Sequence, residues 1–297
     1  MTQNLRTIRD FTRLAMTELA KSGASLGHGA EDLWQEATFL VLRSLALPFN
    51  RLESFWDAAL TESEAARVIN LIHDRAVKKI PAAYLLHEAW LTGHAFYVDE
   101  NVLIPRSFIA ELLEDDLSPW VVNPEAVRSV LDLCTGSGCL AILAKEAFPN
   151  AHVVGADISE KALAVAARNC KDYDMTNAVE LILSDVFSGL KNRRFDLILC
   201  NPPYVTDKAM ATLPEEYRKE PVLALAAGSD GMDFMRRFMP QLKDHLTPEG
   251  MAFVEIGDGQ AAFEALWPNL TVTWLETSAG ENMVFCVSAC DLTAAGL

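Results

Sequence analysis

The stretch that decides the fold is Val130-Leu131-Asp132-Leu133-Cys134-Thr135-Gly136-Ser137-Gly138-Cys139-Leu140. It starts with the apolar residues of a buried strand, passes through a turn that contains two glycines, and enters a predicted helix. Because glycine has no Cβ, a ligand can approach the backbone of this turn closely. In open α/β folds such a turn lies at the carboxyl edge of the sheet, where ligands bind. A tight strand–helix turn without a ligand has the same pattern, so other residues have to decide between the two.

Buried strands and helices alternate from this stretch onward, which predicts a parallel sheet joined by right-handed crossovers. The expected strands cover residues 129–133, 152–156, 179–183, 195–200 and 250–256, and the expected helices cover residues 139–147, 160–169 and 233–245. The last two apolar runs, 271–276 and 282–288, have no helix between them and should form an antiparallel pair at one edge. The fold class is therefore α/β.

The first third of the chain is expected to be a helical bundle. Thr61 and Glu64 fit a capping box, and apolar residues then recur at helical spacing until Pro81 blocks continuation. Residues 5–19 and 33–45 have a similar periodicity.

Two short β-type runs follow, at residues 96–98 and 102–104, and the polar residues between them predict a hairpin. We therefore expect three parts: a helical domain over residues 1–94, a β-hairpin linker over 95–106, and the α/β domain over 107–297.

The composition excludes several classes of protein. Of the 297 residues, 51% are hydrophobic and 22% are charged, which is typical of a packed globular protein and not of a disordered one. No run of about 18 apolar residues occurs, and the N-terminus is polar where a signal peptide has an apolar segment, so we expect a cytoplasmic protein without a membrane partner. Because the six cysteines include no Cys-x-x-Cys pair and the six histidines show no metal-ligand spacing, no metal is expected.

The formal net charge of −16 is unevenly distributed. Residues 1–95 contain 10 basic and 11 acidic side chains, whereas residues 96–297 contain 15 and 30. The larger part of the chain should therefore repel phosphate backbones and attract a basic partner. Solvated acidic surfaces without a partner have the same composition.

Two acids follow the next two strands and favour a nucleotide-like ligand. Asp157 ends the strand after the glycine turn, where a carboxylate can accept hydrogen bonds from both ribose hydroxyls. Asp185 ends the third strand, where a side chain can meet an adenine amino group. Each acid alone is also compatible with a helix cap, and Ser159 competes with Asp157 for that role.

The order of glycine turn, Asp157, Asp185 and then Asn201-Pro202-Pro203-Tyr204 resembles the class I S-adenosylmethionine methyltransferases. The resemblance implies S-adenosylmethionine as cofactor and a Rossmann-like sheet of seven mostly parallel strands, whose last two strands form the edge pair. The implied cofactor-binding residues are Cys134, Thr135, Gly136, Ser137, Gly138, Asp157, Ile158, Asp185, Val186 and Asn201. A nicotinamide dinucleotide is the alternative ligand, but nothing downstream resembles a hydride-transfer site.

The tetrapeptide Asn201-Pro202-Pro203-Tyr204 directly follows the buried strand 195–200. Its prolines stop the strand and fix the backbone, so that the Asn201 side chain and the Pro202 carbonyl can face the carboxyl edge of the sheet. Two acceptors there can hold both protons of a planar NH₂ group and stabilise the positive charge that develops on its nitrogen. Tyr204 can stack on the flat group. Asn201, Pro202 and Tyr204 are the predicted catalytic residues.

The tetrapeptide alone does not distinguish adenine N6, guanine N2 and glutamine amides, but its flanking motifs do. Val102-Leu103-Ile104-Pro105-Arg106 and Glu220-Pro221-x-x-Ala224-Leu225-x-x-Gly228-x-Asp230-Gly231 resemble the protein N5-glutamine methyltransferase family, which modifies translation factors and ribosomal proteins. The resemblance implies that Arg106, Asn201, Pro202, Pro203 and Tyr204 bind the substrate. It also implies that the helical domain helps to grip a protein.

Within that family, Pro105-Arg106-Ser107-x-Ile109-Ala110-Glu111-Leu112 and Glu216-Tyr217-Arg218-x-Glu220-Pro221 resemble the branch that acts on large-subunit ribosomal protein three. The release-factor branch is expected to carry Pro-Arg-Pro-Glu-Thr-Glu instead. Phe108 stands where either branch is expected to have proline, and Val186 stands where some relatives carry tryptophan. Ribosomal proteins are basic, which agrees with the acidic excess of residues 96–297.

The alternatives are a release-factor glutamine methyltransferase and an enzyme that methylates amino groups of RNA or DNA. A nucleic-acid enzyme should have a basic stripe, whereas the basic residues here form isolated pairs and short clusters such as Lys78-Lys79 and residues 191–194. We expect no direct nucleic-acid specificity. The acidic pair Glu215-Glu216 is expected to be solvated.

Overall fold

The structure is a computed structural model that describes residues 5–48 and 51–297. The contacts divide the chain into two compact units. The N-terminal unit comprises Met1–Ala89, Val98–Glu100 and Pro214–Lys219, and the C-terminal unit comprises Trp90–Tyr97, Asn101–Leu213 and Glu220–Leu297. The predicted domain borders at residues 94 and 106 stay a prediction.

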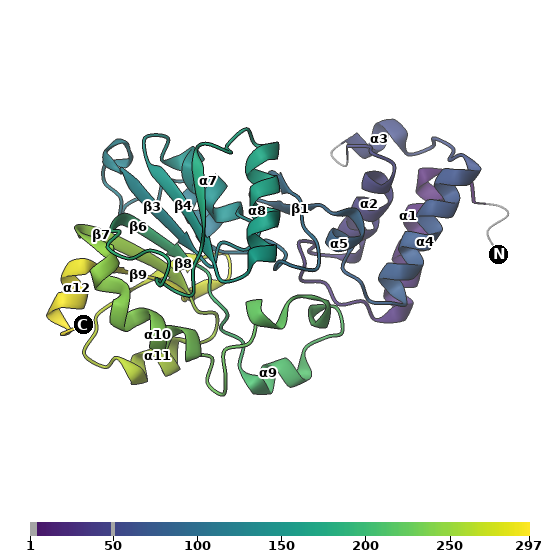
Figure 1. Ribbon diagram of the computed structural model, residues 1–297. Helices are drawn as coiled ribbons and strands as arrows, with labels where there is room; N and C mark the ends of the chain where they lie inside the picture. The colour runs from purple at the N-terminus through teal and green to yellow at the C-terminus, as the bar shows by residue number, and fades with distance from the viewer. Residues whose placement is uncertain (1–4, 49–50) are drawn as a thin grey trace. The chain divides into compact units, whose positions relative to one another are not determined.

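The C-terminal unit is built on a seven-stranded sheet with the order β5-β4-β3-β6-β7-β9-β8 (Figure 1). Its strands are β3 (Ser129–Leu133), β4 (His152–Asp157), β5 (Val179–Leu183), β6 (Phe195–Cys200), β7 (Leu246–Glu255), β8 (Thr273–Thr277) and β9 (Gly280–Ser288). The first five strands pair in parallel, and β9 pairs antiparallel with both β7 and β8. The predicted α/β class, the parallel sheet and the antiparallel edge pair are confirmed.

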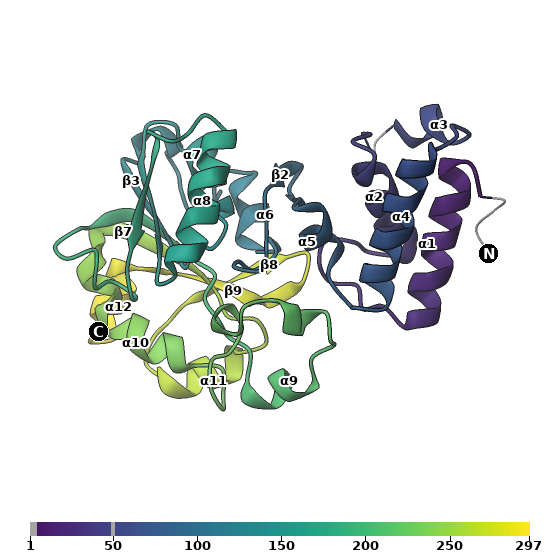
Figure 2. The ribbon, with the colours of Figure 1, turned by 45° about the vertical axis from the view of Figure 1, so that its right-hand side comes forward.

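Helices cover both faces of this sheet, because alternate side chains of each buried strand point to opposite sides. Val130 and Val153 pack in one apolar cluster with the helices α6 (Ile109–Leu113), α7 (Cys139–Ala147) and α8 (Glu160–Asp172). Leu131 and Val154 pack in the other with α10 (Asp233–Leu242), α11 (Gln260–Leu266) and α12 (Ala289–Ala294), which Figures 1 and 2 show together on one side. The remaining short helices of this unit are α9 (Asp207–Thr212), η2 (Pro124–Ala126), η4 (Val222–Ala224) and η5 (Lys243–His245).

The N-terminal unit is helical, as the sequence predicts. Its helices are α1 (Ile8–Ser22), α2 (Leu33–Ser44), α3 (Leu52–Phe55), α4 (Glu62–Ala76), α5 (Ala82–Leu86) and the short η3 (Tyr217–Lys219). The predicted capping box is present at α4, where Thr61 Oγ1 accepts from the Glu64 N–H and Glu64 accepts from the Thr61 N–H. The apolar faces of α1, α2 and α4 form the core of this unit.

The predicted hairpin is misplaced. Residues 96–98 and 102–104 do not pair; the hairpin joins β1 (Ala89–Leu91) to β2 (His94–Phe96) instead. Thr92 and Gly93 connect these strands with positive φ angles of 45° and 82°, the conformation that fits the right-handed twist of a two-residue hairpin. The Ile104 N–H donates to the Glu220 carboxylate, so this run is held by a side chain and not by a strand ladder.

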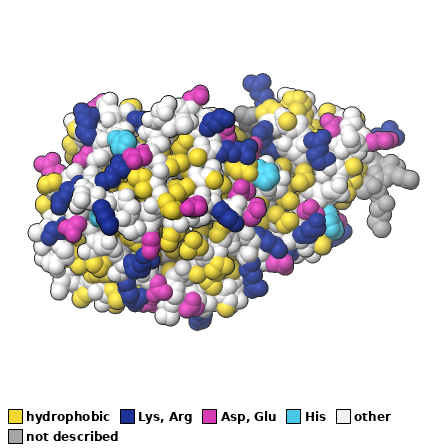
Figure 3. Space-filling model, viewed as in Figure 1, with side chains coloured by type: hydrophobic (Ala, Val, Ile, Leu, Met, Phe, Trp, Pro, Cys, Tyr) yellow, Lys and Arg dark blue, Asp and Glu magenta, His cyan; other side chains and the backbone are white. Residues whose placement is uncertain are grey.

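On the face of the C-terminal unit seen in Figure 3, basic and acidic side chains alternate over short distances. Among the described residues, none of the helices is both long and apolar enough to cross a membrane.

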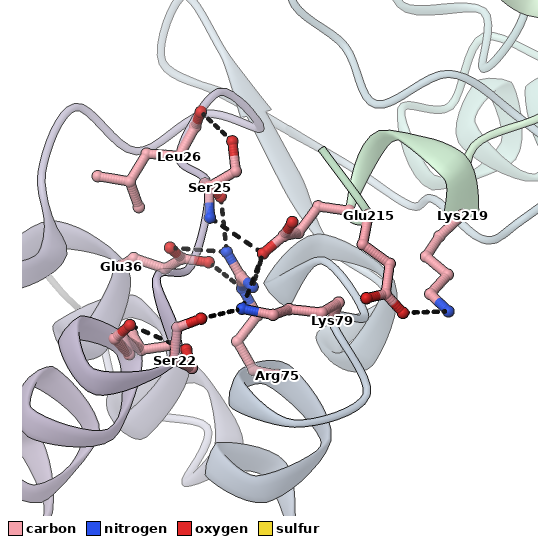
Figure 4. Close-up of polar contacts among 10 residues, drawn as sticks. Ser22, Ser25, Leu26, Glu36, Arg75, Lys79, Glu215 and Lys219 are labelled. Carbon is pink, nitrogen blue, oxygen red and sulfur yellow. Dashed lines mark hydrogen bonds and ion pairs between the residues drawn. The ribbon is translucent and has the colours of Figure 1, made fainter. Parts of the chain in front are cut away.

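A buried ionic network holds Pro214–Lys219 in the N-terminal unit. The guanidinium of Arg75, which is 1% exposed, pairs with Glu36, donates from Nη1 to Glu216 Oε1 at 3.0 Å and donates from Nη2 to the Ser25 carbonyl at 2.8 Å (Figure 4). Lys79 Nζ lies 3.8 Å from Glu216 Oε1 and donates to the Ser22 carbonyl. The expectation that Glu216 is solvated is therefore wrong, because buried cations compensate its charge.

Candidate active site

The register of the sheet brings the predicted site residues to one edge. Strand β3 pairs with β4 on one side and with β6 on the other, so the direction of winding reverses at β3. Leu133 lies opposite both Ala156 and Cys200. The residues next in the chain after these three, Cys134, Asp157 and Asn201, therefore lie side by side at the carboxyl edge.

A cavity of about 260 Å³ opens at this edge, entirely within the C-terminal unit. The ends of β3, β4, β5 and β6 contribute to its wall, together with the loops before α6 and after Pro221 and one face of α10. Its wall includes Leu103, Cys134, Gly136, Asp157, Ile158, Asp185, Val186, Asn201, Pro203, Leu223, Phe234 and Arg237. A smaller adjoining cavity of about 40 Å³ is lined by residues of the glycine turn and by Pro105, Arg106 and Ser107. Asn201 lines both cavities.

The glycine turn is fixed by its neighbours. Cys134, Gly136 and Gly138 all have positive φ angles, which bend the chain sharply from β3 into α7. Asn169 of α8 is buried, and its Nδ2 donates to the Ser137 carbonyl at 2.8 Å and to the Tyr97 carbonyl at 3.0 Å. A Cβ at Gly138 would lie 3.0 Å from the Ala166 Cβ, so glycine there lets α8 pack closely.

Asp157 lies at the end of β4 with its carboxylate against the glycine turn. Its Oδ2 accepts from the Gly136 N–H at 2.9 Å, and its Oδ1 accepts from the Ser159 N–H at 2.8 Å. Burial raises the pKa of Asp157, although these backbone hydrogen bonds oppose the shift. Each oxygen keeps a further lone pair, so the carboxylate can also accept from a bound ligand.

Asp185 lies at the other end of the cavity and forms an ion pair with Arg237 of α10. Arg237 was not predicted as a site residue, because an arginine on an amphipathic helix has the pattern of a surface charge. The apolar side chains of Ile158, Val186 and Phe234 line the same cavity. The cavity therefore offers apolar walls as well as charged groups to a flat ligand.

The tetrapeptide is held on both sides. Val205, the residue after it, forms a parallel bridge with Ala226: its N–H donates to the Leu225 carbonyl, and its carbonyl accepts from the Ala227 N–H. The Tyr204 hydroxyl donates to Glu255 Oε1 at 3.0 Å. Asn201 and Pro203 face the main cavity, whereas Pro202 is buried.

Arg106 is engaged by an acid of the second flanking motif. Its Nη1 and Nη2 donate to the two carboxylate oxygens of Glu220 at 2.7 and 2.8 Å, and the Ile104 N–H donates to Glu220 Oε1 at 3.0 Å. Arg106 lines the smaller cavity, but this bidentate pair also ties the two flanking motifs together.

The structure brings most of the predicted cofactor residues to one place. The main cavity includes Cys134, Gly136, Asp157, Ile158, Asp185, Val186 and Asn201; Thr135 and Ser137 line the smaller one, and Gly138 caps α7 behind them. Glu255 was missed by the sequence analysis. The signal was an acid inside the apolar run Ala252-Phe253-Val254-Glu255-Ile256, the same kind of strand-end acid as Asp157.

The donor set fits S-adenosylmethionine. The cavities combine a backbone turn without bulky side chains, which suits an amino-acid chain, the Asp157 carboxylate, which suits a ribose, and apolar walls with Asp185, which suit an adenine. Within residues 5–48 and 51–297, no group of three or more His, Cys, Asp or Glu side chains is arranged to hold a metal ion.

This sheet order, with a ligand cavity at the switch point, defines a class I methyltransferase. The family model of the methyltransferase small domain matches residues 112–218. The chain is 46% identical over 286 residues to the ribosomal protein uL3 glutamine methyltransferase of Bordetella pertussis, covering 96% of each chain. It is 47% identical over 296 residues to the protein of the same name from Burkholderia pseudomallei, covering 97% of this chain and 96% of that one. The chain belongs to the family of ribosomal protein uL3 glutamine methyltransferases.

Among solved structures, a methyltransferase from Pyrococcus furiosus matches 77% of this chain and 99% of its own, with 15% identity and a TM-score of 0.47.

Proposed function

We propose that this protein transfers the methyl group of S-adenosylmethionine to the side-chain amide nitrogen of a glutamine in ribosomal protein uL3. One observation carries the proposal: Asn201-Pro202 directly follows β6, next to the strand that leads into the glycine turn, and Asn201 lines both cavities at that edge. The Asn201 amide thus adjoins the cavity that fits the cofactor. The membership in the uL3 glutamine methyltransferase family supports the choice of substrate.

S-adenosylmethionine, when bound, supplies a methyl group activated by a sulfonium. Cys134 to Gly138 would surround its amino-acid part, and Asp157 would accept hydrogen bonds from its ribose. Asp185 would meet the adenine, with Ile158 and Val186 against the ring. Asn201 lies close enough to the glycine turn to contact cofactor and substrate.

The chain's own residues would orient the amide and exclude water. Asn201 Oδ1 and the Pro202 carbonyl would each accept one hydrogen of the glutamine NH₂ group, which turns the nitrogen lone pair toward the methyl carbon. These acceptors would stabilise the positive charge that develops on nitrogen as it takes the methyl group. After the transfer the nitrogen would release one of its protons to solvent. Tyr204 and Pro203 would pack against the flat amide.

A basic protein fits the charge of the chain. Residues 96–297 contain twice as many acidic as basic side chains, which should attract a ribosomal protein. We assign substrate binding to the helical domain and chemistry to the α/β domain. Because the proposed substrate is a ribosomal protein, we also propose that the reaction takes place in the cytoplasm.

A direct assay tests the function. Radiolabelled S-adenosylmethionine is offered, with the purified enzyme, to uL3, a release factor, ribosomal RNA and DNA. We expect label in uL3 alone, on glutamine, and no label in a uL3 variant whose modified glutamine is replaced. Label in the release factor alone or in nucleic acid alone would contradict the proposal.

Asp157→Ala should weaken cofactor binding without unfolding the protein. Hydrogen bonds to a charged group contribute about 1.5–3 kcal/mol each, so we expect the affinity for S-adenosylhomocysteine to fall on the order of 10- to 100-fold in calorimetry. Asp172→Ala, at an exposed acid that ends α8, is the matched control and should bind normally. Equal affinities of the two variants would exclude Asp157 as a ribose ligand.

A further inference from the structure

Glu255 is a buried acid that lies at the active edge of the sheet but does not line either cavity described above. Strand β7 runs parallel to β6, and Val254 lies opposite Cys200, so Glu255 follows at the level of Asn201. The residue is 1% exposed. A buried carboxylate is costly unless hydrogen bonds satisfy its oxygens, and its partners therefore indicate what it holds in place.

The partners of Glu255 come from the tetrapeptide Asn201-Pro202-Pro203-Tyr204 and from the two residues that follow Arg106. Its Oε1 accepts from the Tyr204 hydroxyl at 3.0 Å. Its Oε2 accepts from the Ser107 hydroxyl at 2.8 Å and from the Phe108 N–H at 3.0 Å. One side chain thus links the tetrapeptide to the segment that carries Arg106.

The backbone that follows Glu255 lies against the ring of Tyr204. Gly257 has a φ of +53°, and a Cβ built there would lie 2.8 Å from the Tyr204 ring. The end of β7 therefore fixes Tyr204 at two points: Glu255 binds the hydroxyl, and Gly257 lets the ring lie directly against the backbone. Because Tyr204 is two residues from Pro202, fixing its ring restricts the positions of the two proposed acceptors, the Asn201 side chain and the Pro202 carbonyl.

We propose that Glu255 is a positioning residue for methyl transfer: it holds Tyr204, and through it the Asn201-Pro202 acceptors, in register with the Arg106 segment. The inference rests on the proposed function for its kinetic consequences. Phe108 contributes a bond that a proline at that position could not form, because proline has no N–H to donate to Glu255. The loop before α6 is thereby tied to β7 by two hydrogen bonds instead of one.

Three variants separate positioning from folding. Glu255→Leu removes every acceptor, and a displacement of about 1 Å can cost on the order of 100-fold in rate, so we expect kcat to fall by about that factor while the KM for cofactor stays within about twofold. Glu255→Gln should retain most of the wild-type kcat, because the glutamine oxygen can still accept from Ser107 and Phe108 while its NH₂ group donates to the Tyr204 oxygen. Glu249→Leu, at an exposed acid on the same strand, is the matched control.

A double-mutant cycle with Glu255→Leu gives the decisive comparison. Tyr204→Phe, which leaves Glu255 in place, should lower kcat, and adding Glu255→Leu to it should lower kcat by a smaller factor than Glu255→Leu does in the wild-type chain, because Glu255 acts through the hydroxyl. Fully additive losses in kcat, wild-type kcat in Tyr204→Phe, or a folded Glu255→Leu protein with wild-type kcat would overturn the proposal.

Hydrogen exchange of residues 201–205 distinguishes failure of this inference from failure of the proposed function. If the wild-type enzyme methylates none of the offered substrates, the function is wrong, yet faster exchange of this segment in Tyr204→Phe and Glu255→Leu than in Glu249→Leu still supports positioning. Unchanged exchange in both variants refutes it.

Discussion

Asn201→Ala is expected to abolish methyl transfer while leaving cofactor binding nearly intact. The variant loses the side-chain acceptor that would orient the substrate amide and stabilise charge on its nitrogen. Losing one such preorganised polar group costs about 10²–10³-fold in kcat in other enzymes, and we expect a loss of that size here. Single-turnover methylation of uL3 measures the rate, and calorimetry with S-adenosylhomocysteine measures binding.

Two comparisons make this result interpretable. Asn201→Asp keeps an acceptor oxygen and should retain more activity than Asn201→Ala. Asn269→Ala, at an exposed turn between α11 and β8, should behave as wild type. Retained methyl transfer in Asn201→Ala would show that Asn201 does not hold the substrate amide. Loss of both cofactor binding and methyl transfer would instead make Asn201 primarily a cofactor ligand.

Arg75→Ala is expected to destabilise the N-terminal unit severely. Arg75 compensates two buried carboxylates, Glu36 and Glu216, and removing one partner of a buried ion pair costs about 3–5 kcal/mol. Hydrogen exchange resolved by segment should show faster opening of α1, α2 and α4 and of Pro214–Lys219. Strands β3 to β7 should exchange as in the wild type, because they belong to the other unit.

Arg75→Lys and Arg13→Ala serve as comparisons. Lysine keeps the charge but not the planar fork that reaches Glu36, Glu216 and Ser25 together, so an intermediate loss is expected. Arg13 lies on the exposed side of α1, and its removal should change exchange little. If the amides of α4 exchange equally slowly in Arg75→Ala and Arg13→Ala, the buried ionic network contributes no stability.

The sequence predicted the catalytic fold well because its signals are local. A buried strand is an apolar run, a ligand turn requires glycine, and a parallel sheet brings the ends of successive strands to one edge. These rules placed Cys134, Asp157 and Asn201 together, and the structure gives the same arrangement. The hairpin was misplaced because a short apolar run has the same pattern in the sequence whether or not it forms a strand. The positive φ angles of Thr92 and Gly93 fit a two-residue hairpin turn, and the strands on either side of that turn, β1 and β2, are the ones that pair.

The amino-acid sequence by itself determined the fold class, the strand ends that carry the site and the tetrapeptide whose Asn201 and Pro203 line the cavity, because each depends on periodicity or on residues adjacent in the chain. Only the tertiary structure decided which acids hold that site together. Glu255 reaches Ser107 across 148 positions, Glu220 reaches Arg106 across 114, and Glu216 reaches Arg75 across 141. In the sequence Glu216 and Glu220 have the pattern of surface charges and Glu255 has that of a strand-end acid, and only burial beside a distant donor shows that each links two distant segments.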